Sequence, residues 1–474
     1  MGYATASRRS IEAKVAAMSA EGLHACEEKM RADGVHEVAI ETFAHYYRAL
    51  EAGESGLLGE EEIEPVAALE DADDLPEVVG VPLDRTVVIS LNGGLGTSMG
   101  MTGPKSLLEV KDGLSFLDIS ARQVLALRER SGARIPLVLM NSFATREASL
   151  EALSAYPDLA VDGIPADFVQ NKVPKLRAED LLPAEWPADP GLEWAPPGHG
   201  DLYTALQTSG MLSALIDGGY RYAFVSNVDN LGAVLDERIL AWFAGSGAPF
   251  AMEAADRTAA DRKGGHLARR AGDGGLVLRE VAQTPEADLG AFQDVSRHRF
   301  FNTNTLWLDL EQLAAALAER DGVLGLPMIV NRKTVDPSER SSTPVLQLET
   351  AMGAAIGVFD GATALRVPRT RFAPVKATSD LLVLRSDAYS LSEDARLVPV
   401  ADPLPLVSLS DDYKLVGDFE ARFPSGAPSL VECERLTIEA DVTFGADVVV
   451  VGDVLLDEDG ELEDGAQLTG WLED

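Results

Sequence analysis

The stretch Thr86-Val-Val-Ile-Ser90 is a short β-branched run, and it leads through Leu91 into the glycine-rich loop Asn92-Gly-Gly-Leu-Gly-Thr-Ser-Met-Gly100. β-branched residues favour strands because their side chains pack well on a pleated surface. Glycines allow backbone N–H groups to approach a phosphate closely. The stretch therefore predicts a buried strand that ends in a phosphate-binding loop, although a tight strand-to-helix turn without a ligand would use the same glycines.

Two later segments repeat this scheme of an apolar strand followed by a polar loop, namely 136–140 and 222–226. Between the strands, 117–127 and 202–215 show helical spacing of apolar residues, with Asp201 as the expected N-cap of the second helix. Alternating strands and helices predict an α/β fold with a doubly wound, mostly parallel, Rossmann-like sheet. Ligands of such sheets bind beyond the carboxyl ends of the strands.

The two ends of the chain follow other patterns. Residues 10–52 predict two helices separated at Gly34, and the acidic run 60–77 reads as a connector. Near the C-terminus apolar residues recur every six positions, which is typical of a parallel β-helix. One phase of this repeat comprises Ile438, Phe444, Val450, Leu456, Leu462 and Leu468. We therefore expect a helical N-terminal region with its acidic connector (1–80), a nucleotidyltransferase-like catalytic domain (81–390) and a C-terminal β-helix (391–474).

Composition excludes several classes of function. The 474 residues contain 77 Asp and Glu against 40 Lys and Arg, a formal net charge of −37, which disfavours nucleic-acid binding. The two cysteines, Cys26 and Cys433, lie too far apart in sequence to suggest a disulfide framework or a zinc cluster. Because the sequence shows neither an apolar leader nor a stretch long enough to span a bilayer, we expect a cytoplasmic protein that does not bind membranes.

The glycine loop ends in Gly103-Pro104-Lys105. A Walker A loop needs its glycine and lysine to be adjacent, and the glycine spacing also departs from the dinucleotide-binding pattern. Lys105 is one of only ten lysines, of which Lys172, Lys175, Lys263 and Lys376 also lie in glycine- or proline-punctuated loops. A lysine ammonium is a compact charge that suits a phosphate, so these five residues are candidate phosphate ligands.

Asp229 follows the strand at 222–226 and lies between Asn227 and Asn230. A carboxylate at the end of a strand beside a phosphate loop is suited to hold Mg²⁺ bound to a nucleotide, although a turn or capping role would use the same residue. The sequence has no nucleophile elbow, cysteine nucleophile or zinc-binding H-E-x-x-H motif. This inventory fits phosphoryl or nucleotidyl transfer, which needs alignment and charge neutralisation.

With these features in hand, the chain resembles the eukaryotic-type UTP:glucose-1-phosphate uridylyltransferases, also called UDP-glucose pyrophosphorylases. The resemblance is carried, in family order, by Leu91-Asn-Gly-Gly-Leu-Gly-Thr-Ser-Met-Gly-Met-Thr-Gly-Pro-Lys-Ser106, Val169-Gln-Asn-Lys-Val-Pro-Lys175, Pro196-Pro-Gly-His-Gly-Asp201, Ser226-Asn-Val-Asp-Asn-Leu-Gly232, Lys263-Gly-Gly265, Phe301-Asn-Thr-Asn-Thr-Leu-Trp307, Gln347-Leu-Glu-Thr-Ala-Met-Gly353 and Arg371-Phe-Ala-Pro-Val-Lys-Ala-Thr-Ser-Asp380. It implies magnesium-dependent conversion of UTP and α-D-glucose 1-phosphate to UDP-glucose and pyrophosphate.

The resemblance also implies a role for each matching residue. Lys105 and Lys376 are the implied catalytic residues, the first at the triphosphate and the second near the sugar phosphate and α-phosphate, and Asp229 is the implied metal ligand. The implied nucleotide-binding residues are Leu91, Asn92, Gly93, Gly94, Gln170, Gly198 and Asn227. The implied sugar-phosphate-binding residues are His199, Gly265, Glu280 and Asn304.

Several alternatives stay open at this point. A UDP-N-acetylhexosamine or broad UDP-sugar pyrophosphorylase would share the phosphate loop, and a catalytically silent nucleotide-sugar-binding protein would share much of the site. UTP and TTP present the same base edge to Gln170. The β-helix also offers an edge through which two chains could form a homo-oligomer.

Overall fold

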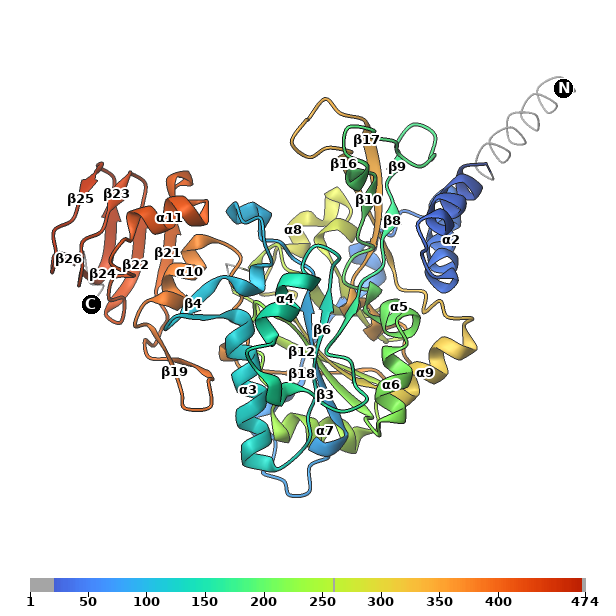
Figure 1. Cartoon of the computed structure of the whole chain (residues 1–474), viewed down its shortest axis with the longest axis horizontal. Coiled ribbons are helices and arrows are strands. Elements are labelled where there is room, and N and C mark those ends of the chain that lie inside the picture. The colour runs from blue at the N-terminus through green and yellow to red at the C-terminus, as the bar shows by residue number, and fades with distance from the viewer. Residues whose placement is uncertain (1–20, 259–260, 471–474) are drawn as a thin grey trace, which may run out of the picture. The chain divides into compact units, whose positions relative to one another are not determined.

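The computed structural model describes residues 21–258 and 261–470. Its contacts divide the described residues into two compact units, each with its own core. Unit 1 lies within 1–76, 168–223 and 242–367, and unit 2 lies within 77–167, 224–241 and 368–474. Figure 1 shows the elements of both units along the chain. Among the described residues, none of the helices has the length and apolarity needed to cross a bilayer.

Unit 1 contains a mixed set of strands covered by short helices. In it β12 pairs with β15 in antiparallel fashion and with β18 in parallel fashion, and β18 is also parallel to β2. A further strand, β13, is antiparallel to both β1 and β14. Its main elements are α2 (Glu37–Glu51), β1 (Ile63–Pro65), β2 (Glu70–Asp71), β8 (Val173–Pro174), β9 (Leu176–Arg177), β10 (Trp194–Ala195), α5 (Asp201–Thr208), α6 (Met211–Asp217), β12 (Phe250–Asp256), β13 (His266–Arg270), β14 (Leu276–Arg279), α8 (Leu289–Phe292), β15 (Phe300–Asp309), α9 (Leu310–Glu319), β16 (Met328–Thr334), β17 (Pro344–Thr350) and β18 (Thr363–Arg366).

Unit 2 contains the strand with which the sequence analysis began. β3 (Thr86–Asn92) has six buried residues out of seven and is parallel to β6 (Leu137–Asn141), as expected for a strand covered on both faces. The other main elements are β4 (Glu109–Lys111), β5 (Leu114–Ser115), α3 (Phe116–Ser131), α4 (Arg146–Leu153), α10 (Thr378–Arg385), β19 (Tyr389–Leu391), β20 (Leu397–Pro399), β21 (Leu406–Leu409), α11 (Val416–Arg422), β22 (Cys433–Ile438), β23 (Val442–Thr443), β24 (Val449–Leu456), β25 (Gly460–Glu461) and β26 (Gln467–Thr469). Three elements, β7 (Asp167–Val169), β11 (Tyr222–Asn227) and α7 (Glu237–Ser246), cross the boundaries between the units along the chain.

The predicted helices form, and one of them is divided in two. The helix expected at 117–127 is α3, which begins at a capping box of Ser115 and Asp118 and ends at the left-handed Gly132. The helix expected at 202–215 is instead two helices, because Gly210 adopts φ +77° between α5 and α6. In the N-terminal region, 21–32 and α2 are helical on either side of Gly34, and the part of the expected helix before residue 21 lies outside the described residues.

The C-terminal six-residue repeat forms the predicted parallel β-helix. Leu436 pairs with Val454, Val442 with Gly460 and Val449 with Gln467, so each coil contains 18 residues, which is three six-residue sides. The apolar positions of the repeat point into a core that they share with Met99, Val228 and Val375. Figure 1 shows β22, β24 and β26 side by side, with α11 beside them. This core joins the β-helix within unit 2 to the loops that follow β3 and β11.

The acidic run expected as a connector also contributes structure to unit 1. Ile63 to Pro65 pair with β13, and Glu70 and Asp71 pair with β18. The boundaries 1–80, 81–390 and 391–474 remain a prediction.

Candidate active site

The glycine loop of unit 2 is held in one shape by its own backbone. Gly96 and Gly100 adopt φ of +63° and +75°, which a residue with a Cβ rarely adopts. The N–H of Lys105 donates to the carbonyl of Gly94 at 3.0 Å, which closes the loop on itself. A Cβ added to Gly94 would meet no atom within 4 Å, so the backbone of this residue is open to a ligand.

Lys105 and Asp229, 124 residues apart in sequence, meet at the end of this loop. The ammonium of Lys105 donates to Oδ2 of Asp229 at 2.6 Å and also to the carbonyl oxygen of Val375. Both side chains are partly exposed, at 15% and 22%. The ammonium can therefore exchange a carboxylate partner for a phosphate oxygen without crossing a buried core.

The segment that carries Lys376 is fixed to the same place. Asn230 accepts from the N–H of Ala373 at 2.8 Å through Oδ1, and its Nδ2 donates to the carbonyl of Arg371 at 3.2 Å. The carboxylate of Asp380 accepts from the N–H of Lys376 at 2.7 Å, at the start of α10. The structure thus brings Lys105, Asp229 and Lys376 into one constellation within unit 2, and it leaves the side chain of Lys376 exposed.

Asp229 fits magnesium by the chemistry of its donor. Mg²⁺ prefers hard oxygen ligands and usually takes one or two protein carboxylates together with phosphate oxygens and water. Among the described residues, no group of three or more His, Cys, Asp or Glu side chains could hold a metal. A single carboxylate such as that of Asp229 meets this requirement of Mg²⁺.

The remaining candidates of unit 2 flank the loop. The N–H of Val228 donates to the carbonyl of Leu91 at 3.1 Å, which ties the end of β11 to the end of β3, and Asn227 lies half-buried at that end. Asn92 is only 1% exposed, and its amide donates to Oδ1 of Asn141 and Oγ of Ser149, both at 2.8 Å. The side chain of Asn92 therefore supports the loop from inside.

In unit 1, Gly198 and His199 lie on a loop that packs against the end of β17. The N–H of Gly200 donates to the carbonyl of Thr350 at 2.8 Å, and the N–H of Thr350 donates to the carbonyl of Pro197 at 2.9 Å. Gly198 has φ +80°, and a Cβ on it would lie 2.4 Å from the carbonyl oxygen of Thr350, so only glycine fits. Nδ1 of His199 accepts from the N–H of Met352 at 2.9 Å.

The sugar-phosphate candidates of unit 1 also lie together. A Cβ on Gly265 would lie 2.4 Å from the carboxylate of Glu280, so Glu280 covers the backbone of Gly265. The carbonyl of Gly265 accepts from the N–H of Asn302 at 3.0 Å, and Nδ2 of Asn302 donates to Oδ1 of Asn304 at 2.8 Å. Asn304 has φ +57° in a bulge of β15 opposite β12, a conformation that often marks a functional site.

Asp201 differs from its expected role. Gly200 is the N-cap of α5, and Asp201 is its first residue. The carboxylate of Asp201 accepts instead from the backbone N–H of Asn171 at 2.5 Å and from Nδ2 of Asn171 at 2.9 Å. Asn171 directly follows the candidate Gln170. The expectation of a cap was therefore wrong, because a partner 30 residues earlier in the chain binds the carboxylate.

Two of the five loop lysines are used by unit 1 itself. Lys172 pairs with Asp33 and lies 4.6 Å from the centre of the Trp194 ring, while the buried Lys175 donates to the carbonyl of Val335 at 2.8 Å. Lys263 is exposed. The lysine argument does not fit Lys175, whose ammonium is buried on a backbone carbonyl, whereas for the partly exposed Lys172 it stays a prediction.

Three contributions to the site carry no signal that we recognised in the sequence. They are three hydrogen bonds: from Lys105 to the carbonyl of Val375, from the amide of Asn302 to Asn304, and from Asn171 to the carboxylate of Asp201. The capping residue Asp380 could have been found, since it stands three residues after Ala377, the N-cap of α10, which is the spacing of a capping box.

Comparisons with known sequences find a matching family and close relatives. The sequence model of the family described as UTP–glucose-1-phosphate uridylyltransferase matches residues 40–451. A probable UTP–glucose-1-phosphate uridylyltransferase of Schizosaccharomyces pombe is 42% identical over 79% of this chain and 73% of its own length, and the Solanum tuberosum enzyme is 42% identical over 78% and 76%.

Solved structures extend the similarity to the fold. A mutant of UDP-glucose pyrophosphorylase from Leishmania major, in complex with UDP-glucose, is 44% identical with a TM-score of 0.90 over 95% of this chain and 99% of that one. A Trypanosoma brucei UDP-glucose phosphorylase is 43% identical with a TM-score of 0.86 over 95% of this chain and 100% of that one. These matches confirm the predicted fold class, and they show that this chain belongs to the UTP–glucose-1-phosphate uridylyltransferase family.

Proposed function

We propose that this chain transfers the uridylyl group of UTP to α-D-glucose 1-phosphate, with Lys105 and Lys376 as its catalytic residues and Asp229 as its magnesium ligand. One observation carries the assignment of roles. Lys105, Asp229 and the backbone beside Lys376 form one hydrogen-bonded constellation, although the three come from segments far apart in the sequence. A protein that only bound the nucleotide sugar would have no need of all three.

The chemistry needs no general base. A phosphate oxygen of glucose 1-phosphate is already ionised, and it attacks the α-phosphorus of UTP in line while pyrophosphate leaves. Lys105 and Lys376 offset the repulsion between the two anions and the charge that develops on the leaving group. Magnesium held by Asp229 and the nucleotide phosphates would supply further charge neutralisation.

Unit 1 supplies the groups that recognise the base and the sugar. Gln170 and the backbone of Gly198 are suited to the uracil edge. Glu280, Asn304 and the backbone of Gly265 offer acceptors and donors to hydroxyl groups, while His199 offers one donor to a phosphate. In unit 2, the backbone of Leu91, Gly93 and Gly94 and the side chain of Asn227 contact the nucleotide.

The test is release of pyrophosphate by the wild type, by Lys376→Ala and by Lys414→Ala. Lys376 is exposed, and its ammonium lies 5.6 Å from the centre of the Phe372 ring, so its substitution should lower kcat by roughly 10²- to 10³-fold with the melting temperature little changed. Lys414, an exposed lysine of the same unit with no assigned role, is the matched control and should retain wild-type kcat.

The same assay examines specificity. UTP or TTP is combined in turn with glucose, galactose and N-acetylglucosamine 1-phosphates, and UTP with glucose 1-phosphate should give the highest kcat/KM. A wild type that releases pyrophosphate from none of these pairs would favour the silent-binder alternative. Near-normal turnover by Lys376→Ala would remove the catalytic role of that lysine.

A further inference from the structure

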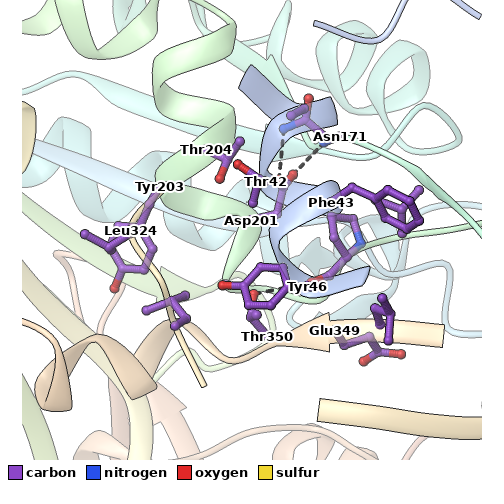
Figure 2. A pocket seen from close by; sticks show the side chains of 16 residues that line it. Thr42, Phe43, Tyr46, Asn171, Asp201, Tyr203, Thr204, Leu324, Glu349 and Thr350 are labelled. Carbon is purple, nitrogen blue, oxygen red and sulfur yellow. Dashed lines mark hydrogen bonds between the residues drawn. The ribbon is translucent and has the colours of Figure 1, made fainter. Parts of the chain in front are cut away.

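Asp201 is a buried carboxylate. Among the described residues that bind it, none has a cationic side chain. Asp201 is 5% exposed, and its hydrogen-bond acceptor positions face the two donors of Asn171. Moving a carboxylate out of water is costly unless hydrogen bonds replace the lost hydration. Figure 2 shows Asp201 and Asn171 linked in this way beside α2. This carboxylate binds a single neighbouring residue, so packing alone does not explain why it is buried.

The surroundings of Asp201 offer little solvation. The adjoining cavity has a volume of about 30 Å³, room for roughly one water molecule. Its titratable side chains, besides Asp201, are Tyr46 of α2, Tyr203 of α5 and Glu349 of β17. No Lys, Arg or His is among the described residues that line it. The ionised form of Asp201 therefore depends on Asn171 for its stabilisation.

Both ends of this link are attached to nucleotide-binding candidates. Asn171 follows Gln170, and Asp201 stands three residues after Gly198. The Gly198 loop is in turn tied to β17 by Gly200 and Thr350, whose backbones are hydrogen-bonded at 2.8 Å. The hydrogen bonds of Asp201 thus connect the Gln170 segment to a loop whose other side is fixed on β17.

We propose that Asp201 is a positioning residue, whose carboxylate holds Gln170 in register with the Gly198–His199 loop so that both can contact the base. This inference rests on the proposed function of unit 1 in nucleotide recognition. Asp201 does not touch the nucleotide, and it acts through Asn171. Its loss should therefore weaken binding of the nucleotide while the phosphate chemistry of Lys105 and Lys376 continues.

Protonation of Asp201 gives this role a signature. Burial raises the pKa of Asp201 to about 7. Above that pH both carboxylate oxygens accept from Asn171, whereas below it one of them carries a proton that faces an N–H donor. Burial also holds the pKa values of Tyr46 and Tyr203 above their usual range and lowers that of His199 to about 4, so none of these three titrates between about pH 6 and 8.5.

The experiment measures the dissociation constant of UDP-glucose by calorimetry between about pH 6 and 8.5, since this ligand has no group that titrates there. For the wild type, Kd should rise as the pH falls through about 7. Asp201→Asn should raise Kd by about tenfold at about pH 8 and should show no dependence on pH. Its KM for UTP should rise similarly, with kcat within about twofold of wild type because the reacting groups are untouched.

Stability separates positioning from packing. Because the folded pKa of Asp201 lies above its unfolded value, the stability linked to this group falls as the pH rises from about 4 to 7. Removal of the charge by Asp201→Asn should therefore leave the melting temperature at about pH 8 unchanged or higher. The matched control is Asp309→Asn, a buried aspartate that caps α9 and pairs with Arg221 at 2.8 Å, which should lower the melting temperature and leave Kd unchanged.

A second variant covers the possibility that Asp201→Asn does not fold. Asn171→Ala keeps the backbone hydrogen bond and loses the side-chain one, so it should raise Kd by about threefold. A wild-type Kd in Asp201→Asn, or a parallel loss of melting temperature and affinity, would overturn the inference and leave the proposed function standing. A wild type that does not bind UDP-glucose would overturn the proposed function and this inference with it.

Discussion

The imidazole of His199 is a neutral hydrogen-bond donor rather than a cation. Burial lowers its pKa to about 4, so the ring is uncharged above about pH 5. Since Nδ1 accepts from the N–H of Met352, the ring proton resides on Nε2. In the proposed function, His199 would therefore orient a phosphate oxygen through a single directed hydrogen bond, and the positive charge would come from Lys105 and Lys376.

The neutral state of His199 predicts how the effect of a substitution on kcat/KM depends on pH. His199→Gln retains a donor and should lower kcat/KM by roughly tenfold. The ratio of wild-type to variant kcat/KM should stay constant between about pH 5.5 and 8.5, because His199 does not titrate there and the ionisation of the substrates cancels in the ratio. Steady-state kinetics across this range measure the ratio, and a rise toward acidic pH would show a charged imidazole.

At the scale of elements, the β13–β14 hairpin is supported by a buried ionic network. Arg279, which precedes Glu280, is fully buried and donates to Glu60 at 2.6 Å, and Arg297 also donates to Glu60 at 2.6 Å. His298 contacts Glu60 at 3.0 Å, and its ring stacks at 3.8 Å on His266, which follows Gly265. The acidic run thus holds, from behind, the hairpin that presents Gly265 and Glu280.

Substitution of Glu60 should therefore destabilise the protein. Glu60→Gln leaves the buried Arg279 uncompensated and should lower the free energy of unfolding by about 3 kcal/mol at about pH 7. The neighbouring Glu61 is exposed, and Glu61→Gln should change the free energy of unfolding by less than about 0.5 kcal/mol. Urea denaturation of the three proteins gives these values.

The effect of Glu60 should also depend on pH. Burial alone would raise the pKa of Glu60, but hydrogen bonds from Arg279, Arg297 and His298 outweigh it and hold that pKa below its usual range. A lowered folded pKa contributes stability above the unfolded value of about 4.3 and loses it as the pH falls. The difference between wild type and Glu60→Gln should shrink from about pH 7 to pH 4, and a constant difference would argue against the ionic network.

At the scale of the whole molecule, the net charge of −37 opposes the arrival of polyanionic substrates. Long-range repulsion between a negative surface and UTP is reduced by salt, because the Debye length falls from about 30 Å at about 0.01 M to about 8 Å at about 0.15 M. In the proposed function, the positive charge that attracts the phosphates is local, at Lys105 and Lys376. Capture of the substrate should therefore respond to ionic strength differently from catalysis.

We expect kcat/KM for UTP to rise about two- to threefold between ~10 and ~150 mM KCl at fixed free Mg²⁺. The value of kcat at saturating substrate is the internal control, and it should stay constant because no encounter step limits it. A monotonic fall of kcat/KM with salt would mean that local attraction by the lysines exceeds the repulsion of the whole surface.

Local sequence patterns determined the parts of this protein that depend on neighbours along the chain. β3 and its loop follow from β-branched residues and glycines, and the coils of the β-helix follow from a six-residue repeat. The matching motifs also placed the chain in its family. Each of these depends on backbone preference or periodicity, which a stretch of roughly 10 to 20 residues carries by itself.

Tertiary structure alone decided which side chains meet. Asp201 was expected to cap its own helix and instead binds Asn171. Lys175 was expected at a phosphate and is instead buried on the carbonyl of Val335. Lys105 was assigned to the end of its loop, yet its partners Asp229 and Val375 come from 124 and 270 residues away. A polar side chain takes the best partner that folding brings within about 3 Å, and that partner is set by the packing of the chain, which local sequence does not encode.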